Sequence, residues 1–204
     1  MLKNVNNEFS LRGRMVFFAT ANVHKFNEAR RVLNDSEIAV GMLKLKGDEI
    51  QSDSLQVIAE KSVQSAYKKC RFPIIVEDAG LFIDALGGFP GPYAAYAYKT
   101  IHNRGILRLM ENKENRVATF KSVISYCDNQ TLGPLSFFGQ SKGVITQVER
   151  YQGGSVFGFD PIFQPQGSFK TFAEMSLLEK NGYSHRAEAL NNFVRWYKAL
   201  QINP

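Results

Sequence analysis

Short apolar runs alternate with longer stretches in which apolar residues recur at three-and-four spacing along the first half of the chain. The runs at 15–20, 39–45 and 74–76 are short enough to be strands buried on both faces. The stretches at 23–33 and 54–70 have the spacing of amphipathic helices. The order strand, helix, strand, helix, strand implies right-handed crossovers, so we expect a sheet with a parallel portion.

The polar residues before these two helices predict where each helix begins. Asn22 is a good N-cap for the first helix, and Asp53 or Ser52 is the expected cap of the second. The second helix has the most regular pattern in the chain, with one stripe facing the core. This stripe consists of Leu55, Ile58, Ala59, Ser62, Val63, Ala66, Tyr67 and Cys70.

The second half of the chain predicts strands of a different kind. Residues 93–110 have mixed helical character, and 116–126 and 135–148 form two long predicted strands joined by a hairpin-type connection. We expect these strands to add an antiparallel part to the sheet, or to build a second lobe. A short helix near 173–180 and a final helix at 184–200 close the chain. The final helix is predicted to bury Ala187, Leu190, Phe193, Val194 and Tyr197.

Two adjacent carboxylates follow the apolar run at 74–76. The strand is predicted to end at Glu77 and Asp78, and a short helical piece is predicted at 81–86. Because side chains alternate across a strand, the two acids point to opposite faces. One of them is then placed in the crevice at the carboxyl end of the sheet, where open α/β folds bind ligands. A turn with two solvated acids is the alternative.

Composition limits the class of protein. The chain has 204 residues and ordinary globular proportions, and no apolar run approaches the ~20 residues of a membrane span. The polar segment 1–13 is expected to be a loosely ordered tail without a secretory signal. Cys70 and Cys127 are too few for a disulfide framework or a thiolate zinc site, which favours a reducing, cytoplasmic setting.

The net charge of +6 favours anionic partners. Lys and Arg are scattered along the chain, and the sequence has no helix-turn-helix, zinc-finger or aromatic RNA-binding pattern. We therefore expect a small anionic substrate rather than a stable nucleic-acid partner, although a nucleic-acid-binding module stays a competing hypothesis.

Cations stand at two predicted helix starts, where acids are the rule because of the helix dipole. His24 and Lys25 follow the Asn22 cap, and His185 and Arg186 follow Ser184. Backbone N–H groups together with cations make an anion site, and phosphate is the usual occupant. The alternative is that exposed cations are tolerated there in a high dielectric.

Three further features carry possible chemistry. Glu49 and Asp78 would form a hard-oxygen site for magnesium on a polyphosphate if the fold brings them together. Lys61 either snorkels at the surface of its helix or reaches a phosphate. The segment F-G-F-D at 157–160 either stacks on a base and accepts a hydrogen bond from its edge, or plugs a glycine-rich loop.

A series of short motifs in fixed order resembles the inosine triphosphate pyrophosphatase family, the non-canonical purine NTP pyrophosphatases. The resemblance covers roughly residues 16–190, and the run A-Y-K-T-I-H-N-R-G-I-L-R-L-M is most similar to the archaeal branch. The motifs are T-A-N-V-H-K, E-I-Q-S, V-E-D-A-G-L, L-G-G-F-P-G-P-Y, F-G-F-D-P-I-F, T-F-A-E-M, K-N-G-Y-S-H-R and A-L.

The resemblance implies an α/β fold with an elongated mixed β-sheet, flanking helices and two lobes around a central cleft, all within one domain over 1–204. It implies hydrolysis of ITP, dITP and XTP to the monophosphate and pyrophosphate with Mg²⁺, and a homodimer. Under it, Asp78 and Lys61 are catalytic, and Glu49 and Asp78 bind the metal. The implied substrate-binding residues are Thr20, Ala21, Asn22, Val23, His24, Lys25, Ala79, Phe157, Gly158, Phe159, Asp160, Lys180, His185 and Arg186.

Within this set, the resemblance implies separate roles. Thr20, Asn22 and Lys25 would hold the triphosphate, and Phe157 would stack on the purine. Arg186 carries only N–H donors, which suit the 6-oxo group of hypoxanthine or xanthine and oppose the 6-amino group of adenine.

The sequence departs from the family at three positions. Ala21 stands where Gly or Ser is common, Ala79 where Ser or Thr is usual, and Ala94 where Ser is frequent. The last two replacements remove hydroxyl groups, which could lower affinity or alter specificity. Maf-like nucleotide pyrophosphatases are a second enzyme hypothesis, but their opening S-x-S-x-R signature is missing here.

Overall fold

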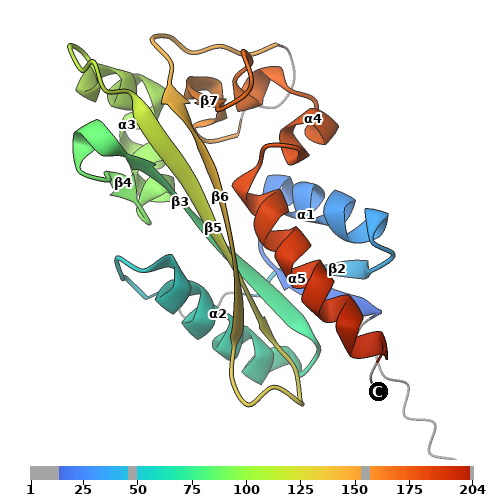
Figure 1. Cartoon of the computed structure of the whole chain (residues 1–204). Coiled ribbons are helices and arrows are strands. Elements are labelled where there is room, and N and C mark those ends of the chain that lie inside the picture. Colours follow the sequence, from blue (N-terminus) through green and yellow to red (C-terminus); the bar gives the residue numbers. More distant parts are fainter. Residues whose placement is uncertain (1–13, 46–49, 153–156, 203–204) are drawn as a thin grey trace, which may run out of the picture.

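The computed structural model describes residues 14–45, 50–152 and 157–202, and its centre is one mixed β-sheet (Figure 1). The strands follow the order β2-β1-β3-β5-β6-β7, and β4 pairs with β3 beside this path. Their bounds are β1 Met15–Ala19, β2 Ala39–Leu43, β3 Ile74–Ile83, β4 Pro90–Gly91, β5 Val117–Cys127, β6 Leu135–Ile145 and β7 Phe163–Pro165.

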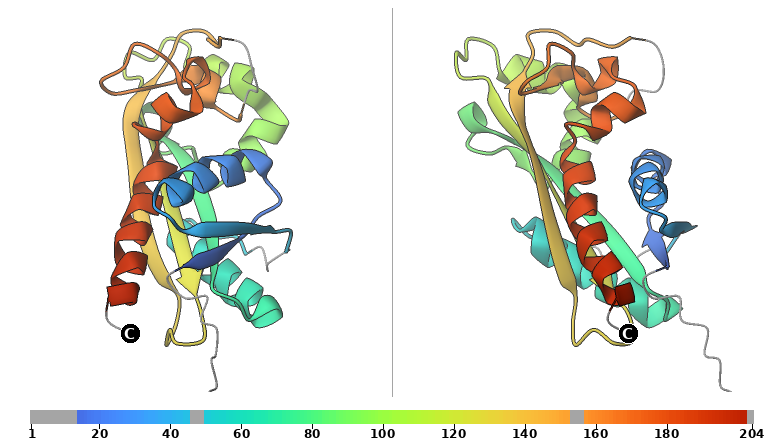
Figure 2. Two further views of the ribbon diagram at one scale, coloured as in Figure 1. Left: turned by 90° about the vertical axis from the view of Figure 1, so that its right-hand side faces the viewer. Right: turned by 45° about the vertical axis from the view of Figure 1, so that its right-hand side comes forward.

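Helices cover both faces of this sheet. Two of them, α1 and α5, lie on one face and α2 lies on the other, while α3 and α4 lie at the end that is uppermost in Figure 1 (Figures 1 and 2). Within the described ranges, no helix is long and apolar enough to cross a membrane. The helices are α1 Val23–Asp35, α2 Leu55–Cys70, α3 Ala94–Leu109, α4 Leu177–Asn181 and α5 His185–Ile202, with 3-10 turns at Asp84–Leu86, Asp160–Ile162 and Phe172–Glu174.

The expected division into parallel and antiparallel parts is confirmed. β1 pairs in parallel with β2 and β3, as the predicted crossovers require. β5 pairs antiparallel with β3 along ten residues and with β6 along the hairpin. The long strands β3, β5 and β6 run from one end of the molecule to the other (Figure 1).

The predicted end of β3 is wrong. The strand continues through Glu77 and Asp78 to Ile83, and only Asp84–Leu86 of the predicted helical piece is helical. The physical reason is the partner strand: the ladder runs from Ile74 opposite Cys127 to Ile83 opposite Ala118, so backbone groups stay paired beyond the two acids. The two carboxylates therefore lie in the middle of a strand.

The helix caps agree with prediction at one helix and differ at the other. Asn22 caps α1, because its side-chain oxygen accepts hydrogen bonds from the backbone N–H groups of His24 and Lys25. The cap of α2 is Ser54, whose hydroxyl accepts from the Val57 N–H, and neither Asp53 nor Ser52. Ser and Asp are both preferred N-cap residues, so the polar run before the helix does not by itself decide which of them is the cap.

Two main apolar clusters give the molecule its two lobes. The lower cluster joins α1 and α5 to β1, β3 and β5, and it buries the five α5 residues predicted from the helical pattern. The upper cluster joins α3 to the far ends of β3 and β5, to β7 and to the 3-10 turns at 160–162 and 172–174. The continuous strands hold the lobes together, and the residues between the clusters are the polar ones described next.

Candidate active site

Side chains from distant parts of the chain line a cavity of about 360 Å³ between the two lobes. Its walls come from the start of α1, the middle of β3, the residues around the start of α3, the segment 157–160 and the start of α5. Many of the residues singled out from the sequence meet here: Asn22, Lys25, Asp78, Ala79, Phe157, Gly158, Phe159, Asp160, His185 and Arg186.

Glu77 and Asp78 point to opposite faces of β3, as alternation predicts. Glu77 is fully buried on the α5 side, where its carboxylate accepts from the Arg186 Nε at 3.1 Å and from the Ser122 hydroxyl at 2.8 Å. The Lys25 ammonium lies 2.6 Å from its other oxygen. Glu77 therefore joins the first turn of α1 to the first turn of α5.

Glu28 extends this chain of ion pairs on the opposite side of Arg186. It is 5% exposed on α1, and its two oxygens accept from Lys180 and Arg186. The Lys180 ammonium lies 2.7 Å from Glu28 and 2.6 Å from Asp160. The order along the network is Lys25, Glu77, Arg186, Glu28, Lys180 and Asp160, so cations and anions alternate.

Alternating charge sets the pKa values in this network. Burial alone would raise the pKa of Glu28, but the charges of Arg186 and Lys180 outweigh it and lower the pKa to about 2. Burial likewise opposes ionisation of Glu77, yet Arg186 and Lys25 hold its pKa far below the usual range. Burial disfavours the Lys180 cation, but Asp160 and Glu28 raise its pKa. Glu28, Glu77 and Lys180 are therefore charged at neutral pH, whereas burial raises the pKa of Asp160 despite the neighbouring Lys180 charge.

This pairing changes the interpretation of the cations at the helix starts. Arg186 is buried and shared between two carboxylates, so it is no free cation for a phosphate. At α1, the N–H groups of His24 and Lys25 are already bonded to Asn22, and the Asn22 N–H donates to the Thr20 hydroxyl at 3.1 Å. At α5, the Arg186 N–H donates to the Ser184 hydroxyl at 3.2 Å. These N–H groups are bonded within the chain, and a phosphate site at the helix starts stays a prediction.

His185 is neutral in this environment. Its ring stacks on Phe120 at 4.6 Å with an interplanar angle of 8°, and it lines the cavity. Burial, with the neighbouring Arg186 charge, lowers its pKa to about 3. The side chain therefore contributes a polar but uncharged group to the cavity wall.

Asp78 differs from the paired carboxylates. Burial raises its pKa to about 6, although Lys25 opposes the change. Within the described residues its Oδ2 is buried and has no hydrogen-bond partner. An ionised, unpartnered carboxylate oxygen beside a cavity fits Mg²⁺, which commonly takes one or two protein carboxylates and completes its shell with phosphate and water. No cluster of three metal-ligating side chains occurs among the described residues.

Phe157 contributes an aromatic ring to the lining of the cavity. Its ring lies 5.2 Å from the His24 ring with an interplanar angle of 22°. The Lys180 ammonium is 5.5 Å and the Arg186 guanidinium 5.8 Å from its centroid. An aromatic face beside these groups suits a flat, polar-edged ring.

Other predicted residues take different places. His24 and Lys180 contact residues that line the cavity: the His24 ring stacks on Phe157, and Lys180 donates to Asp160. Thr20 accepts a hydrogen bond from the backbone N–H of Asn22, which also lines the cavity. Ala21 and Val23 are exposed, and Lys61 lies on an exposed face of α2, outside the cavity lining in the part of the chain that the structure describes. Glu49 lies outside the described residues.

Two of the three departures from the family pattern fall on the cavity. Ala79 and Ala94 both line it, next to Pro92, Ala95 and Tyr98. The lost hydroxyl groups would therefore have faced a bound molecule, and this wall is apolar except for the Tyr98 hydroxyl.

Sequence reasoning missed four side chains that shape the site. Glu28 bridges Lys180 and Arg186, Ser122 donates to Glu77, and Phe120 and Tyr98 line the cavity. Glu28 could have been found, because it lies beside Ala29 and four residues before Val32 on the buried face of α1. The others are contributed by strand register and helix packing, which the sequence pattern does not specify.

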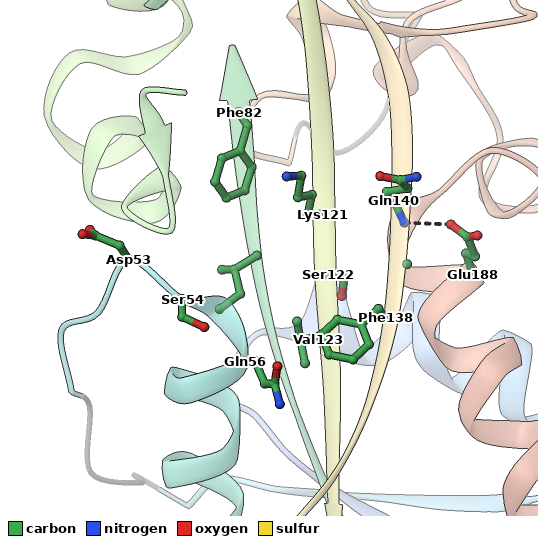
Figure 3. Close-up of a pocket in the computed structure, with 12 residues that line it drawn as sticks. Asp53, Ser54, Gln56, Phe82, Lys121, Ser122, Val123, Phe138, Gln140 and Glu188 are labelled. Carbon is green, nitrogen blue, oxygen red and sulfur yellow. Dashed lines mark hydrogen bonds between the residues drawn. The ribbon is translucent and has the colours of Figure 1, made fainter. Parts of the chain in front are cut away.

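A second groove, of about 500 Å³, lies on the α2 side of the sheet (Figure 3). It runs from Asp53 and Gln56 across Phe82 and Lys121 to Phe138 and the edge of β6 (Figure 3). None of the residues predicted from the sequence to bind substrate or metal lines it. The alternating charges described above belong to the smaller cavity, which we take as the candidate active site.

Comparison with known proteins shows the family to which the chain belongs. A family model described as the Ham1 family matches residues 16–196. The chain is 47% identical over 183 residues to the dITP/XTP pyrophosphatase of Methanopyrus kandleri, covering 90% of this chain and 96% of that protein. It is 46% identical to the dITP/XTP pyrophosphatase of Thermococcus kodakarensis over 89% of this chain and 96% of that one.

Solved structures show the same similarity. The Ham1 protein of Staphylococcus aureus superposes with a TM-score of 0.76 at 27% identity, covering 91% of this chain and 99% of that one. A HAM1 protein from Coxiella burnetii gives a TM-score of 0.76 at 27% identity, over 92% of this chain and 98% of that chain.

Proposed function

The chain belongs to the Ham1 family, and on that premise we propose that it hydrolyses ITP, dITP and XTP to the monophosphate and pyrophosphate. Relatives named dITP/XTP pyrophosphatase match at high coverage along nearly their whole length. The observation that carries the proposal is the cavity between the lobes, whose lining combines the aromatic ring of Phe157 with Lys25 and Asp78.

The base would occupy the end formed by Phe157, Asp160, His185 and Arg186. Phe157 offers a stacking face, and Arg186 retains N–H donors beyond those used by Glu77 and Glu28. These donors suit a 6-oxo purine and oppose a 6-amino purine. Glu77 and Glu28 fix the guanidinium, so it is preorganised for the base.

The triphosphate would occupy the end formed by Asn22, Lys25 and Asp78. Each cation of the ion-pair network is already paired with at least one carboxylate before substrate binds. The several negative charges of a triphosphate therefore need further cations, and Mg²⁺ on Asp78, with Glu49 as a second ligand, would supply charge stabilisation there.

In the reaction, Asp78 would accept a proton from the attacking water while the oxygen of that water forms a bond to the phosphorus of the α-phosphate. The bond between the α- and β-phosphates breaks, and pyrophosphate leaves. A raised pKa of about 6 makes Asp78 a stronger base than an ordinary aspartate while it stays mostly ionised at neutral pH. Lys25, between Glu77 and the cavity, would stabilise the charge that develops on the phosphate oxygens.

A product assay tests this function. Purified protein with Mg²⁺ is incubated with ITP, dITP, XTP, ATP or GTP, and pyrophosphate and orthophosphate are measured separately. We expect pyrophosphate and the monophosphate from the first three substrates, with much slower turnover of ATP and GTP. Stepwise release of orthophosphate, or equal turnover of ATP and ITP, would contradict the proposal.

Three finer proposals accompany the activity. We propose that the enzyme is cytoplasmic, because both of its cysteines are free thiols, as a reducing compartment would keep them.

We propose a homodimer, which light scattering of the purified protein would test. We also propose that residues 1–204 form one domain, in which the two lobes unfold together in a single transition.

A further inference from the structure

Phe157 depends on side-chain contacts for its position. Gly158, which follows it, has a positive φ of 54°, a conformation that glycine adopts without strain. The Asp160 N–H donates to the Phe157 carbonyl at 3.1 Å and closes this turn, but that bond does not fix the orientation of the ring. A ring that stacks on a base needs a fixed orientation. The contacts to the ring must supply that orientation.

One of these contacts comes from the start of α1. The His24 ring stacks on Phe157 at 5.2 Å and 22°, and within residues 14–45, 50–152 and 157–200 no other aromatic ring stacks on Phe157. The two cations near the ring, Lys180 and Arg186, are fixed by carboxylates of the ion-pair network. Among the residues that the structure describes, His24 thus provides the one aromatic ring against which Phe157 can align.

The cavity touches Phe157 and does not touch His24. Phe157 is among the side chains that line it, together with Asn22 and Lys25 on either side of His24 in the sequence, whereas His24 itself is not. A base bound in the cavity would therefore meet Phe157 and not His24.

The backbone of His24 has a separate task. Its N–H donates to the Asn22 side chain at 3.0 Å, as part of the α1 cap. Asn22 and Lys25, which line the phosphate end, belong to the same helical turn. A single turn of α1 therefore contacts Phe157 through His24 and also supplies Asn22 and Lys25, which we propose to bind the triphosphate.

We propose that His24 is a positioning residue, whose imidazole holds Phe157 so that purine, Phe157 and His24 form a three-layer stack. This inference rests on the proposed function. It adds that His24 contributes to binding of the base and does not contribute to binding of the phosphates. His24 acts through Phe157 and makes no direct contact with the triphosphate.

Steady-state kinetics of His24→Ala and His24→Phe test the proposal. Aromatic pairs contribute about 0.5–1.5 kcal/mol, so we expect the KM for ITP to rise about two- to tenfold in His24→Ala, with a smaller change in kcat. His24→Phe retains a flat ring and should restore the KM. Inhibition by inorganic pyrophosphate, which has no base, should be the same in all three proteins. Arg31→Ala, on the exposed face of the same helix, is the control for a general effect on α1.

Each other result is decisive. If His24→Ala weakens pyrophosphate inhibition as much as ITP binding, His24 is a phosphate ligand and the proposal is wrong. An unchanged KM for ITP in His24→Ala, or failure of His24→Phe to restore it, also overturns the proposal while leaving the function intact. A wild-type protein that releases no pyrophosphate from ITP overturns the proposed function, and the inference with it.

Discussion

At the scale of single residues, neighbouring acids in one strand have opposite electrostatic properties. Glu77 faces Arg186 and Lys25 in a buried network and stays ionised. Asp78 lies on the other face, has an unpartnered oxygen and has a pKa raised by burial. A one-residue step along a strand thus separates a structural carboxylate from a candidate catalytic one.

Asp78→Asn should separate function from stability. Loss of a general base lowers turnover by about 10²–10⁴-fold. The folded-state pKa of about 6 lies above the ordinary 3.8, so ionised Asp78 destabilises the metal-free fold above pH 6, by at most about 3 kcal/mol. Urea denaturation in EDTA at pH 8 should show the variant to be more stable than wild type. This difference should shrink as the pH falls through 6 and vanish below about 4. Near-normal turnover of the variant would refute the assignment.

His185 predicts an acid sensitivity of the opposite sign. Its folded pKa of about 3 lies below the ordinary 6.5, so below pH 6.5 the unfolded chain binds a proton that the folded protein does not. The contribution falls by about 1.4 kcal/mol per pH unit, or roughly 2 kcal/mol at pH 5. In His185→Phe this loss should be missing, so thermal melts at pH 7 and pH 5 should differ less than in wild type. An equal difference in both proteins would contradict the lowered pKa.

At the scale of elements, α3 contains a local irregularity. His102 has φ 56° and ψ −171°, a conformation outside the helical region that side-chain-bearing residues rarely adopt. Its ring packs edge-on against Tyr98, and Tyr98 lines the cavity. The bend in α3 is therefore close to the candidate site.

Replacing His102 by glycine should relieve this strain. Such a backbone conformation costs about 1–3 kcal/mol, partly offset by the larger entropy of glycine in the unfolded chain. We expect His102→Gly to stabilise the protein by about 1 kcal/mol, a rise of about 2–4 °C in Tm by calorimetry. His102→Ala keeps a side chain and should give no such gain. Stabilisation by alanine as large as by glycine would rule out backbone strain as the cause.

The edge of the sheet is another feature of the element scale. Beyond its pairing with β7, β6 has an outer edge that is blocked by side chains of α5. The Gln140 N–H donates to Glu188 at 2.7 Å (Figure 3), and the Phe138 carbonyl accepts from Asn192 at 2.8 Å. Bonded edge groups are not available to pair with a strand of another molecule.

At the scale of the whole molecule, Glu28 ties the two lobes together. It belongs to α1 in the lower lobe, and through Lys180 it reaches Asp160 in the 3-10 turn of the upper lobe. Removal of one partner from a buried ion pair leaves an uncompensated charge. The network therefore connects the residues that we propose to bind the base to the relative position of the lobes.

Glu28→Gln should weaken this connection. We expect a loss of about 3 kcal/mol in the free energy of unfolding, and faster hydrogen exchange in residues 157–163 and 177–181. The matched control is Asp35→Asn in the exposed Arg31–Asp35 pair of the same helix, which should change stability by less than about 0.5 kcal/mol. Equal losses in the two variants would show that burial of the Glu28 pairs has no special effect.

The sequence by itself determined the class of the fold and most elements, because periodicity depends only on local geometry. Apolar runs located β1 and β2, and the three-and-four stripes located α2 and α5, to within two residues at their amino-terminal ends. Motif order also identified most residues that line the cavity, since each motif contains its own side chains.

The tertiary structure alone decided which of these side chains pair. Only the β3–β5 ladder shows that Glu77 and Asp78 lie within a strand, because strand pairing is a contact between distant segments. Only packing shows that Arg186 is neutralised by Glu77 and Glu28, residues more than a hundred positions away. Charge at a helix start can be read locally, but whether that charge is free depends on partners that the fold brings to it.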